Sequence, residues 1–191
     1  MVPVYKGDKA FKKIIDDIDL GKDIYSVKSF VAGYVWGMEI VQPSRLIAEL
    51  LLQETDDEIE LESESQAMDL YGNIMGLWNE ISSHNKKIVC AFRNLPALPV
   101  DLSKLNNFLW NFEADINLFL AGLLETGSYD SGDREISGYI SELEEMAHII
   151  EKLSGRDNIS SDMVNEVHEL MCNLYQRWKV IFPPYVRIDV D

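Results

Sequence analysis

The chain has 191 residues, 47% of them apolar, and its 33 Asp and Glu against 17 Lys and Arg give a net charge of -16. This length and apolar content fit one globular domain with a substantial core and exclude a disordered chain. A surface this negative repels phosphate backbones and anionic lipid headgroups, so it disfavours nucleic acids and membranes as partners and favours a basic protein or a cation.

Apolar residues recur at spacings of three and four almost throughout the chain, and no stretch alternates convincingly with a period of two. This pattern predicts an all-α protein of about seven helices. The predicted helices span residues 8–19, 24–39, a segment from Pro43 onward, 63–88, 103–126, a sixth helix whose apolar stripe runs from Ile136 to Leu153, and 161–182.

Local signals mark where several of these helices begin and which segments separate them. Ser44 and Asp133 are expected caps, and SESQ at 63–66 has the spacing of a capping box. Residues 54–64 hold seven acids in eleven positions, which predicts a solvated loop before the fourth helix. Two prolines within 94–103 predict a linker before the fifth helix.

Two short motifs recur in the same order along the chain, which predicts an internal duplication. FVAG at 30–33 returns as FLAG at 119–122, and LYGNIMGLWNEI from Leu70 aligns with LMCNLYQRWKVI from Leu170. The predicted fold is therefore all-α, with about seven helices arranged as two pseudo-repeated halves. The halves span residues 24–93 and 103–184 of one compact domain, residues 1–191.

The repeated motifs place glycines inside predicted helices, where a glycine costs about 0.5–1 kcal/mol relative to alanine. Ser29, Gly33 and Gly37 lie four residues apart and form a small-residue strip, which Gly122 and Thr126 repeat in the second half. Either the two helices cross at these glycines, or each glycine makes room for a bulky tryptophan. In both cases we interpret Gly33, Gly37 and Gly122 as packing residues.

Four tryptophans fall in corresponding helices of the two halves: Trp36, Trp78, Trp110 and Trp178. Large aromatic side chains of amphipathic helices are usually buried, so we expect all four, Trp36 as well as Trp78, Trp110 and Trp178, to pack in the core. The alternative is an exposed aromatic groove that receives a helix of a partner protein.

Several residues of the first half resemble the signature of the YecA/YgfB family of uncharacterised bacterial proteins: Phe30, Gly33, Tyr34, Gly37, Pro43 and Ser44. LWNEI at 77–81 is similar to the family's middle helix, and Trp110 with FLAG resembles its second-half element, at a wider spacing. The resemblance covers most of residues 24–126. It implies an all-helical fold, a cytoplasmic bacterial origin, self-association as a homodimer, and no established enzymatic site. Some relatives append a cysteine-rich zinc-binding tail, but FPPYVRIDVD at 182–191 holds no cysteine, so we do not expect zinc delivery by that route.

One spacing in the sequence suits a metal site. Glu145 and His148 have the Glu-x-x-His spacing of carboxylate-bridged di-iron bundles, because positions i and i+3 point the same way on a helix. Such a site needs a second Glu-x-x-His, but the residue three before His168 is Asn165. We interpret Glu145 and His148 as a surface salt-bridging face, with metal binding as the alternative, and expect no cofactor.

No nucleophile elbow, phosphate loop or dinucleotide fingerprint is present in the sequence. Cys90 and Cys172 lie on apolar helix faces and are typical of structural thiols in a reducing compartment. The first twenty residues intersperse charges with apolar residues, which predicts no signal peptide, and no uncharged stretch suits a membrane span. We expect a non-enzymatic cytoplasmic regulator or adaptor that binds a basic protein through an acidic helical surface.

Overall fold

The computed structural model describes residues 3–36, 42–51, 61–83, 93–127, 134–154 and 159–181. Within these ranges the chain forms seven α-helices and no strand, which confirms the all-α prediction. The helices are α1 (Asp8–Asp17), α2 (Ile24–Trp36), α3 (Pro43–Leu51), α4 (Glu64–Ser83), α5 (Leu102–Glu125), α6 (Arg134–Ser154) and α7 (Ser161–Ile181). Over the described residues, no helix has the length and apolar character that a membrane span requires.

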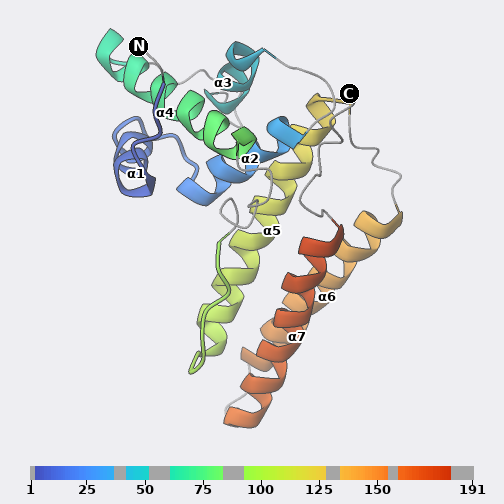
Figure 1. Cartoon of the computed structure of the whole chain (residues 1–191). Coiled ribbons are helices and arrows are strands. Elements are labelled where there is room, and N and C mark those ends of the chain that lie inside the picture. Colours follow the sequence, from blue (N-terminus) through green and yellow to red (C-terminus); the bar gives the residue numbers. More distant parts are fainter. Residues whose placement is uncertain are drawn as a thin grey trace.

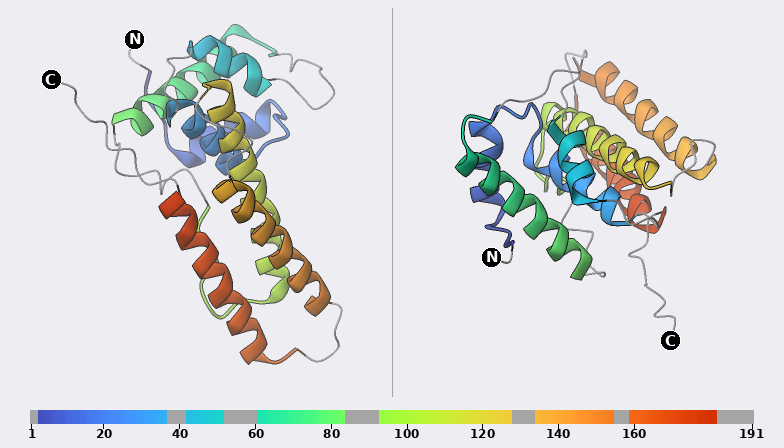
Figure 2. Two further views of the ribbon diagram at one scale, coloured as in Figure 1. Left: turned by 90° about the vertical axis from the view of Figure 1, so that its right-hand side faces the viewer. Right: turned by 90° about the horizontal axis from the view of Figure 1, so that it is seen from above.

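Helix α5 is the longest of these elements and organises the molecule (Figure 1). Helices α1 to α4 gather around the C-terminal half of α5, while α6 and α7 run alongside it and form an elongated bundle (Figure 2). Two apolar clusters follow this division, one built by α1 to α4 and the other mainly by α5 to α7. The clusters adjoin where α2 crosses α5, since Ala32 of α2 belongs to the second cluster.

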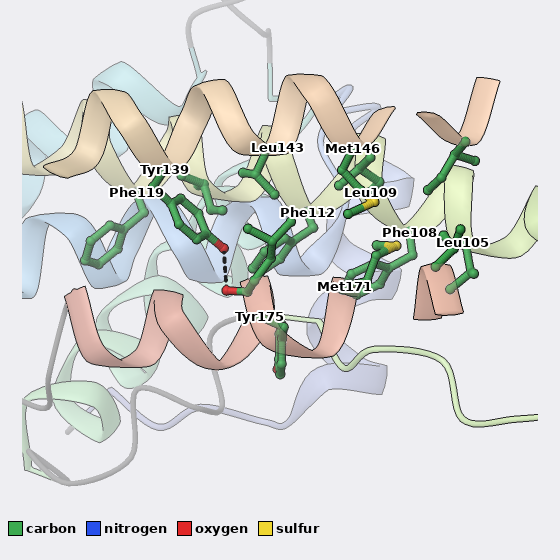
Figure 3. Packing of buried hydrophobic residues seen from close by; sticks show 14 of the residues in the cluster. Leu105, Phe108, Leu109, Phe112, Phe119, Tyr139, Leu143, Met146, Met171 and Tyr175 are labelled. Atoms are coloured by element: carbon green, nitrogen blue, oxygen red, sulfur yellow. Dashed lines mark hydrogen bonds between the residues drawn. The ribbon is translucent and has the colours of Figure 1, made fainter. Parts of the chain in front are cut away.

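Aromatic side chains fill much of the core between α5, α6 and α7 (Figure 3). Phe108 and Phe112 stack with their ring centroids 5.3 Å apart, and Tyr175 packs against both rings. Tyr139 is fully buried, and its hydroxyl donates a hydrogen bond to the carbonyl oxygen of Leu174 at 2.9 Å. This bond ties α6 to α7 and satisfies the one polar atom of the Tyr139 side chain.

Polar side chains begin two helices close to the expected positions. The Ser63 hydroxyl accepts from the Gln66 N–H at 3.2 Å, so Ser63 caps α4 at the predicted position. The Gln66 side chain accepts from the N–H of Glu62 at 2.7 Å, one residue before the N–H that a capping box uses. The Asp101 side chain accepts from the Lys104 N–H at 2.8 Å and starts α5 just before the predicted boundary. Outside the described residues lie the predicted cap Asp133, Gly37 with its neighbours 38–41, and residues 54–60 of the acidic run.

Helices α2 and α5 cross at Gly33 and Gly122, backbone against backbone. A methyl group added to Gly33 would overlap the carbonyl oxygen of Phe119 and lie 3.1 Å from the Cα of Gly122. A methyl group added to Gly122 would lie 2.8 Å from the carbonyl oxygen of Phe30 and 2.9 Å from the nitrogen of Tyr34. Backbone atoms, and no tryptophan, thus occupy the space beside these glycines. Of the two arrangements that the glycine spacing allowed, the structure therefore has the helix crossing and not the space for a tryptophan.

The two motif pairs behind the predicted duplication differ in their structural environments. At the crossing, the FVAG and FLAG motifs are equivalent, since each phenylalanine carbonyl lies against the glycine of the other motif. The second pair is not equivalent, because Leu70 and Asn73 are buried whereas Leu170 and Asn173 are exposed. Helices α4 and α7 therefore present different faces to the core, and duplication of the complete halves stays a prediction.

Two of the tryptophans pack as the sequence led us to expect. Trp36 and Trp78 are half-buried, each against one of the apolar clusters. The ring of Trp36 meets that of Phe119 edge-on, with the centroids 5.8 Å apart. The side chain of Trp178 lies outside the described residues.

The assignment of Trp110 to helix packing is wrong, because its side chain is 62% exposed. Trp110 lies on the same face of α5 as the exposed residues Asn107, Ala114 and Asn117, three, four and seven positions away. The buried residues of α5 lie on its other faces. The prediction rested on the residue type and on the corresponding helices of the two halves. It overlooked Asn107 and Asn117, two polar residues that mark this face of the helix as exposed.

Candidate protein-binding groove

The N-terminal residues 3–7 lie across helix α4 and form one wall of the candidate site. The Lys6 N–H donates to Asn73 Oδ1 at 3.1 Å, and the Lys6 ammonium pairs with Asp69 at 2.6 Å. Asn73 is fully buried, and its amide donates to the carbonyl oxygen of Asp69 at 2.8 Å. A methyl group on Gly76 would overlap the backbone of this segment. The absence of a side chain at Gly76 therefore lets residues 3–7 lie directly on α4.

An open groove of about 780 Å³ lies between this segment, α3 and α4. Its lining is mostly apolar and includes Val4, Ile47, Leu61, Met68, Leu70 and Tyr71. Seven large apolar side chains of the described residues are exposed, and three of the seven meet here: Val4 at 67%, Met68 at 68% and Tyr71 at 47%. Exposed apolar side chains that gather in a concave surface mark sites where another molecule binds.

The helical side of the groove is flat at Gly72. This residue lines the groove one turn before Gly76, on the same face of α4. A methyl group on Gly72 would meet nothing within 4 Å, whereas the same group on Gly76 would overlap the N-terminal segment. Residues 3–7 therefore cover one half of a small-residue strip and leave the other half open.

Two carboxylates of α4, Glu64 and Asp69, line the groove. Glu62 and Glu64 end the acidic run that begins at residue 54, and Glu64 lines the groove beside Leu61. Among the described residues that line the groove, Lys6 is the single lysine, and it already pairs with Asp69. Neither Glu62 nor Glu64 has an ion-pair partner within the part of the chain that the structure describes. The border of the groove thus carries an excess of negative charge.

A second cluster of charged residues joins the linker before α5 to helices α2 and α5. Arg93 donates to the two carboxylate oxygens of Asp115 at 2.6 and 3.0 Å and to Asp23 at 2.8 Å. Asp115 is fully buried and also accepts from the Ser26 hydroxyl at 3.2 Å. Asp23 caps α2 by accepting from the N–H groups of Tyr25 and Ser26, each at 2.9 Å. Because these groups satisfy one another, the cluster is a structural clasp.

Burial and the guanidinium act in opposite directions on the two carboxyl groups of this clasp. Burial raises the pKa of Asp115, and the bonds from Arg93 offset this only in part. Burial also acts to raise the pKa of Asp23, but hydrogen bonds from Ser26 and Arg93 outweigh it and leave that pKa below its usual range. Loss of Arg93 would leave Asp115 as a buried carboxyl without a cation beside it.

His168 connects α7 to the same linker. Its Nε2 lies 2.8 Å from the carbonyl oxygen of Pro96, and since a carbonyl only accepts, Nε2 carries the hydrogen. The Cys172 sulfur lies 3.7 Å from Nδ1 of the same ring. Cys172 is half-buried, and Cys90 lies outside the described residues.

The metal candidates Glu145 and His148 are both exposed on α6. His148 is 61% exposed and lies 3.9 Å from Glu151, while Glu145 lines a smaller groove between α6 and α7. No hydrogen bond or ion pair joins Glu145 to His148 in the described part of the chain. Among all the residues that the structure describes, no three His, Cys, Asp or Glu side chains are placed to hold a metal ion together.

Comparisons with protein-family models, with curated proteins and with solved structures found no match. The resemblance of Phe30, Gly33 and Tyr34 to the YecA/YgfB signature therefore stays a prediction. Support for the candidate site comes from the geometry of this chain alone.

Sequence reasoning missed both the groove and the clasp, although each left a signal. Gly72 and Gly76 have the same four-residue spacing as Gly33 and Gly37, inside the segment that aligns with residues 170–181. Asp115 lies on the apolar face of its helix, three residues after Phe112. A carboxylate in such a position indicates a buried partner of opposite charge.

Proposed function

We propose that this protein is a non-enzymatic, cytoplasmic regulator or adaptor that holds an apolar segment of another protein in the groove between residues 3–7, α3 and α4. The observation that supports this function best is the clustering of Val4, Met68 and Tyr71. Their side chains are exposed, whereas the other large apolar side chains that the structure describes in residues 3–83 are buried or half-buried.

The construction of the groove supports binding without a large rearrangement. One wall, residues 3–7, is fixed by the Lys6–Asn73 bond and by the close approach at Gly76. The other wall is the 20-residue helix α4, whose Leu70, Ile74 and Leu77 are buried in the core. When the walls of a groove are already fixed, binding a partner costs less conformational entropy. More of the free energy gained by burying the exposed apolar side chains then appears as affinity.

The charge of the chain restricts the class of partner. With a net charge of -16, the protein is repelled by nucleic acids and by anionic membranes and attracts basic proteins. Binding of a basic protein should be faster at low ionic strength, because the summed field steers the encounter.

A photo-crosslinking amino acid placed at Met68 tests this function. The matched control carries the same amino acid at Ser141, which is also exposed but lies on α6, away from the groove. We expect irradiation in cells to give discrete protein adducts from position 68 that are missing from position 141. Adducts of the same pattern from both positions, or none from position 68, would count against the groove as the binding site.

A further inference from the structure

The occupant of the groove can be defined from the shape of its helical side. Met68, Gly72 and Gly76 follow one another at four-residue intervals along one face of α4. At Gly76 this face already receives a polypeptide backbone, that of residues 3–7. Gly72 offers the same close approach one turn earlier, with nothing yet within 4 Å. The surface is therefore suited to a further segment that packs tightly against α4.

The length of the open surface fits a helix of about two turns. Gly72 and Glu64 both line the groove and are separated by eight positions of α4, or about 12 Å at 1.5 Å per residue. Met68 and Tyr71 of α4 line the groove near Gly72 as exposed apolar side chains, and Leu61 and Val4 also belong to the lining. Such a groove matches apolar side chains at positions i, i+3 or i+4, and i+7 of an amphipathic helix.

The charges at the border define the polar side of that helix. Glu64 of the lining and the exposed Glu62, two residues before it, have no cationic partner within the described residues, and Lys6 is already paired with Asp69. A lysine or arginine beside the apolar stripe of the occupant would meet these carboxylates. A second copy of this chain is a poor occupant, because it would bring a further charge of -16 to the same border.

Resting on the proposed function, we propose that the partner segment is a basic amphipathic α-helix, which packs its apolar stripe over Gly72 between Met68 and Val4 and directs its lysines or arginines to Glu62 and Glu64. The recognition combines helix-in-groove packing with complementary charge at the rim.

Three synthetic peptides of equal length test the proposal. The first is an amphipathic leucine–lysine helix, the second replaces every lysine with glutamate, and the third scrambles the first so that its apolar stripe is lost. Each is titrated by calorimetry into the full chain and into two variants, Gly72→Arg and Gly138→Arg. Gly138 is the matched control, because it is also a mid-helix glycine with nothing within 4 Å, but it lies on α6.

We expect the leucine–lysine helix to bind the wild-type chain and the Gly138→Arg variant with similar affinity. Gly72→Arg should weaken this binding by about tenfold, or about 1.4 kcal/mol, because its side chain fills the groove and neutralises the border. The affinity should also fall as salt is added, and the glutamate and scrambled peptides should bind much more weakly. Met68→Gln is a second variant that removes apolar contact at an exposed position, and it should weaken binding in the same direction.

Several results would overturn the proposal. If Gly72→Arg and Gly138→Arg weaken peptide binding equally, the lysines of the peptide are attracted by the acidic surface as a whole and not by the groove. Equal binding of the scrambled peptide would remove the requirement for an amphipathic helix. If no peptide binds, or if the glutamate peptide binds as well as the lysine peptide, the basic helix is wrong. After either of these last two results, protein adducts from the crosslinker at position 68 would still support the proposed function. The basic-helix proposal and the proposed function can therefore fail separately.

Discussion

Gly33 and Gly72 are both inside helices, but their surroundings predict opposite effects of the same substitution. Gly33→Ala should lower the free energy of unfolding by about 3 kcal/mol, because its methyl group would overlap the Phe119 carbonyl and force α2 from α5. Gly72→Ala should raise the free energy of unfolding by about 0.5–1 kcal/mol, since the methyl group meets nothing and alanine favours the helix. Urea denaturation of both variants measures the two effects. Similar changes in both would contradict the crossing at Gly33.

The Arg93 clasp predicts a strongly non-additive pair of substitutions. Arg93→Met should lower the free energy of unfolding by about 3–5 kcal/mol, because it leaves Asp115 buried without its cation. The double variant Arg93→Met with Asp115→Leu should be more stable than the single variant, since both charges are then removed together. A double-mutant cycle by urea denaturation measures the coupling. Additive losses would show that the Arg93–Asp115 pair contributes little.

For single residues, the spacing in the sequence predicted the packing role of Gly33 and Gly122. It did not predict the close approach at Gly76, the open face at Gly72 or the Arg93 clasp. Spacing of four residues places small residues on one helix face, and that follows from helix geometry alone. Whether another segment covers the face depends on residues distant in the chain. Arg93 and Asp23 are 70 positions apart, and no local pattern connects them.

The N-terminal segment behaves as a separate element whose position depends on Gly76. Gly76→Ala should displace residues 3–7 from α4 while leaving the helices folded, because the new methyl group would overlap the segment's backbone. The Lys6 N–H should then exchange with solvent faster, having lost its bond to Asn73. Hydrogen exchange followed by NMR measures this rate. Unchanged protection of Lys6, with Gly72→Ala as the control, would show that the segment does not depend on Gly76.

The helices themselves were predictable because apolar periodicity of three and four is a property of each element alone. The environment of a single helix face was less predictable, as Trp110 shows. Its helix was placed correctly, but the exposed side of α5 includes this tryptophan. The groove was not predictable at all, because residues 3–7 have no periodic signal and their position depends on contacts with α4.

The net charge of the whole molecule predicts how its stability responds to salt. A chain with a charge of -16 repels itself in the folded state, and this repulsion acts over about 30 Å at 0.01 M salt but only about 8 Å at 0.15 M. We therefore expect the melting temperature to rise between these two concentrations of sodium chloride. Calorimetry measures the shift, and potassium chloride at the same concentrations controls for an effect specific to sodium. A melting temperature that falls with salt would mean that ion pairs such as Lys28–Asp8 outweigh the repulsion.

The reciprocal contact at the α2–α5 crossing has a consequence for how this chain can vary. When two side chains clash, a smaller residue at one position can rescue a larger one at the other. Such a rescue is not open to Gly33 and Gly122, because neither residue can be replaced by a smaller one. Each also faces a main-chain carbonyl of the other motif, which no substitution removes. A suppressor screen starting from Gly33→Ala should therefore return only true revertants or changes elsewhere that move whole helices, and none at Gly122.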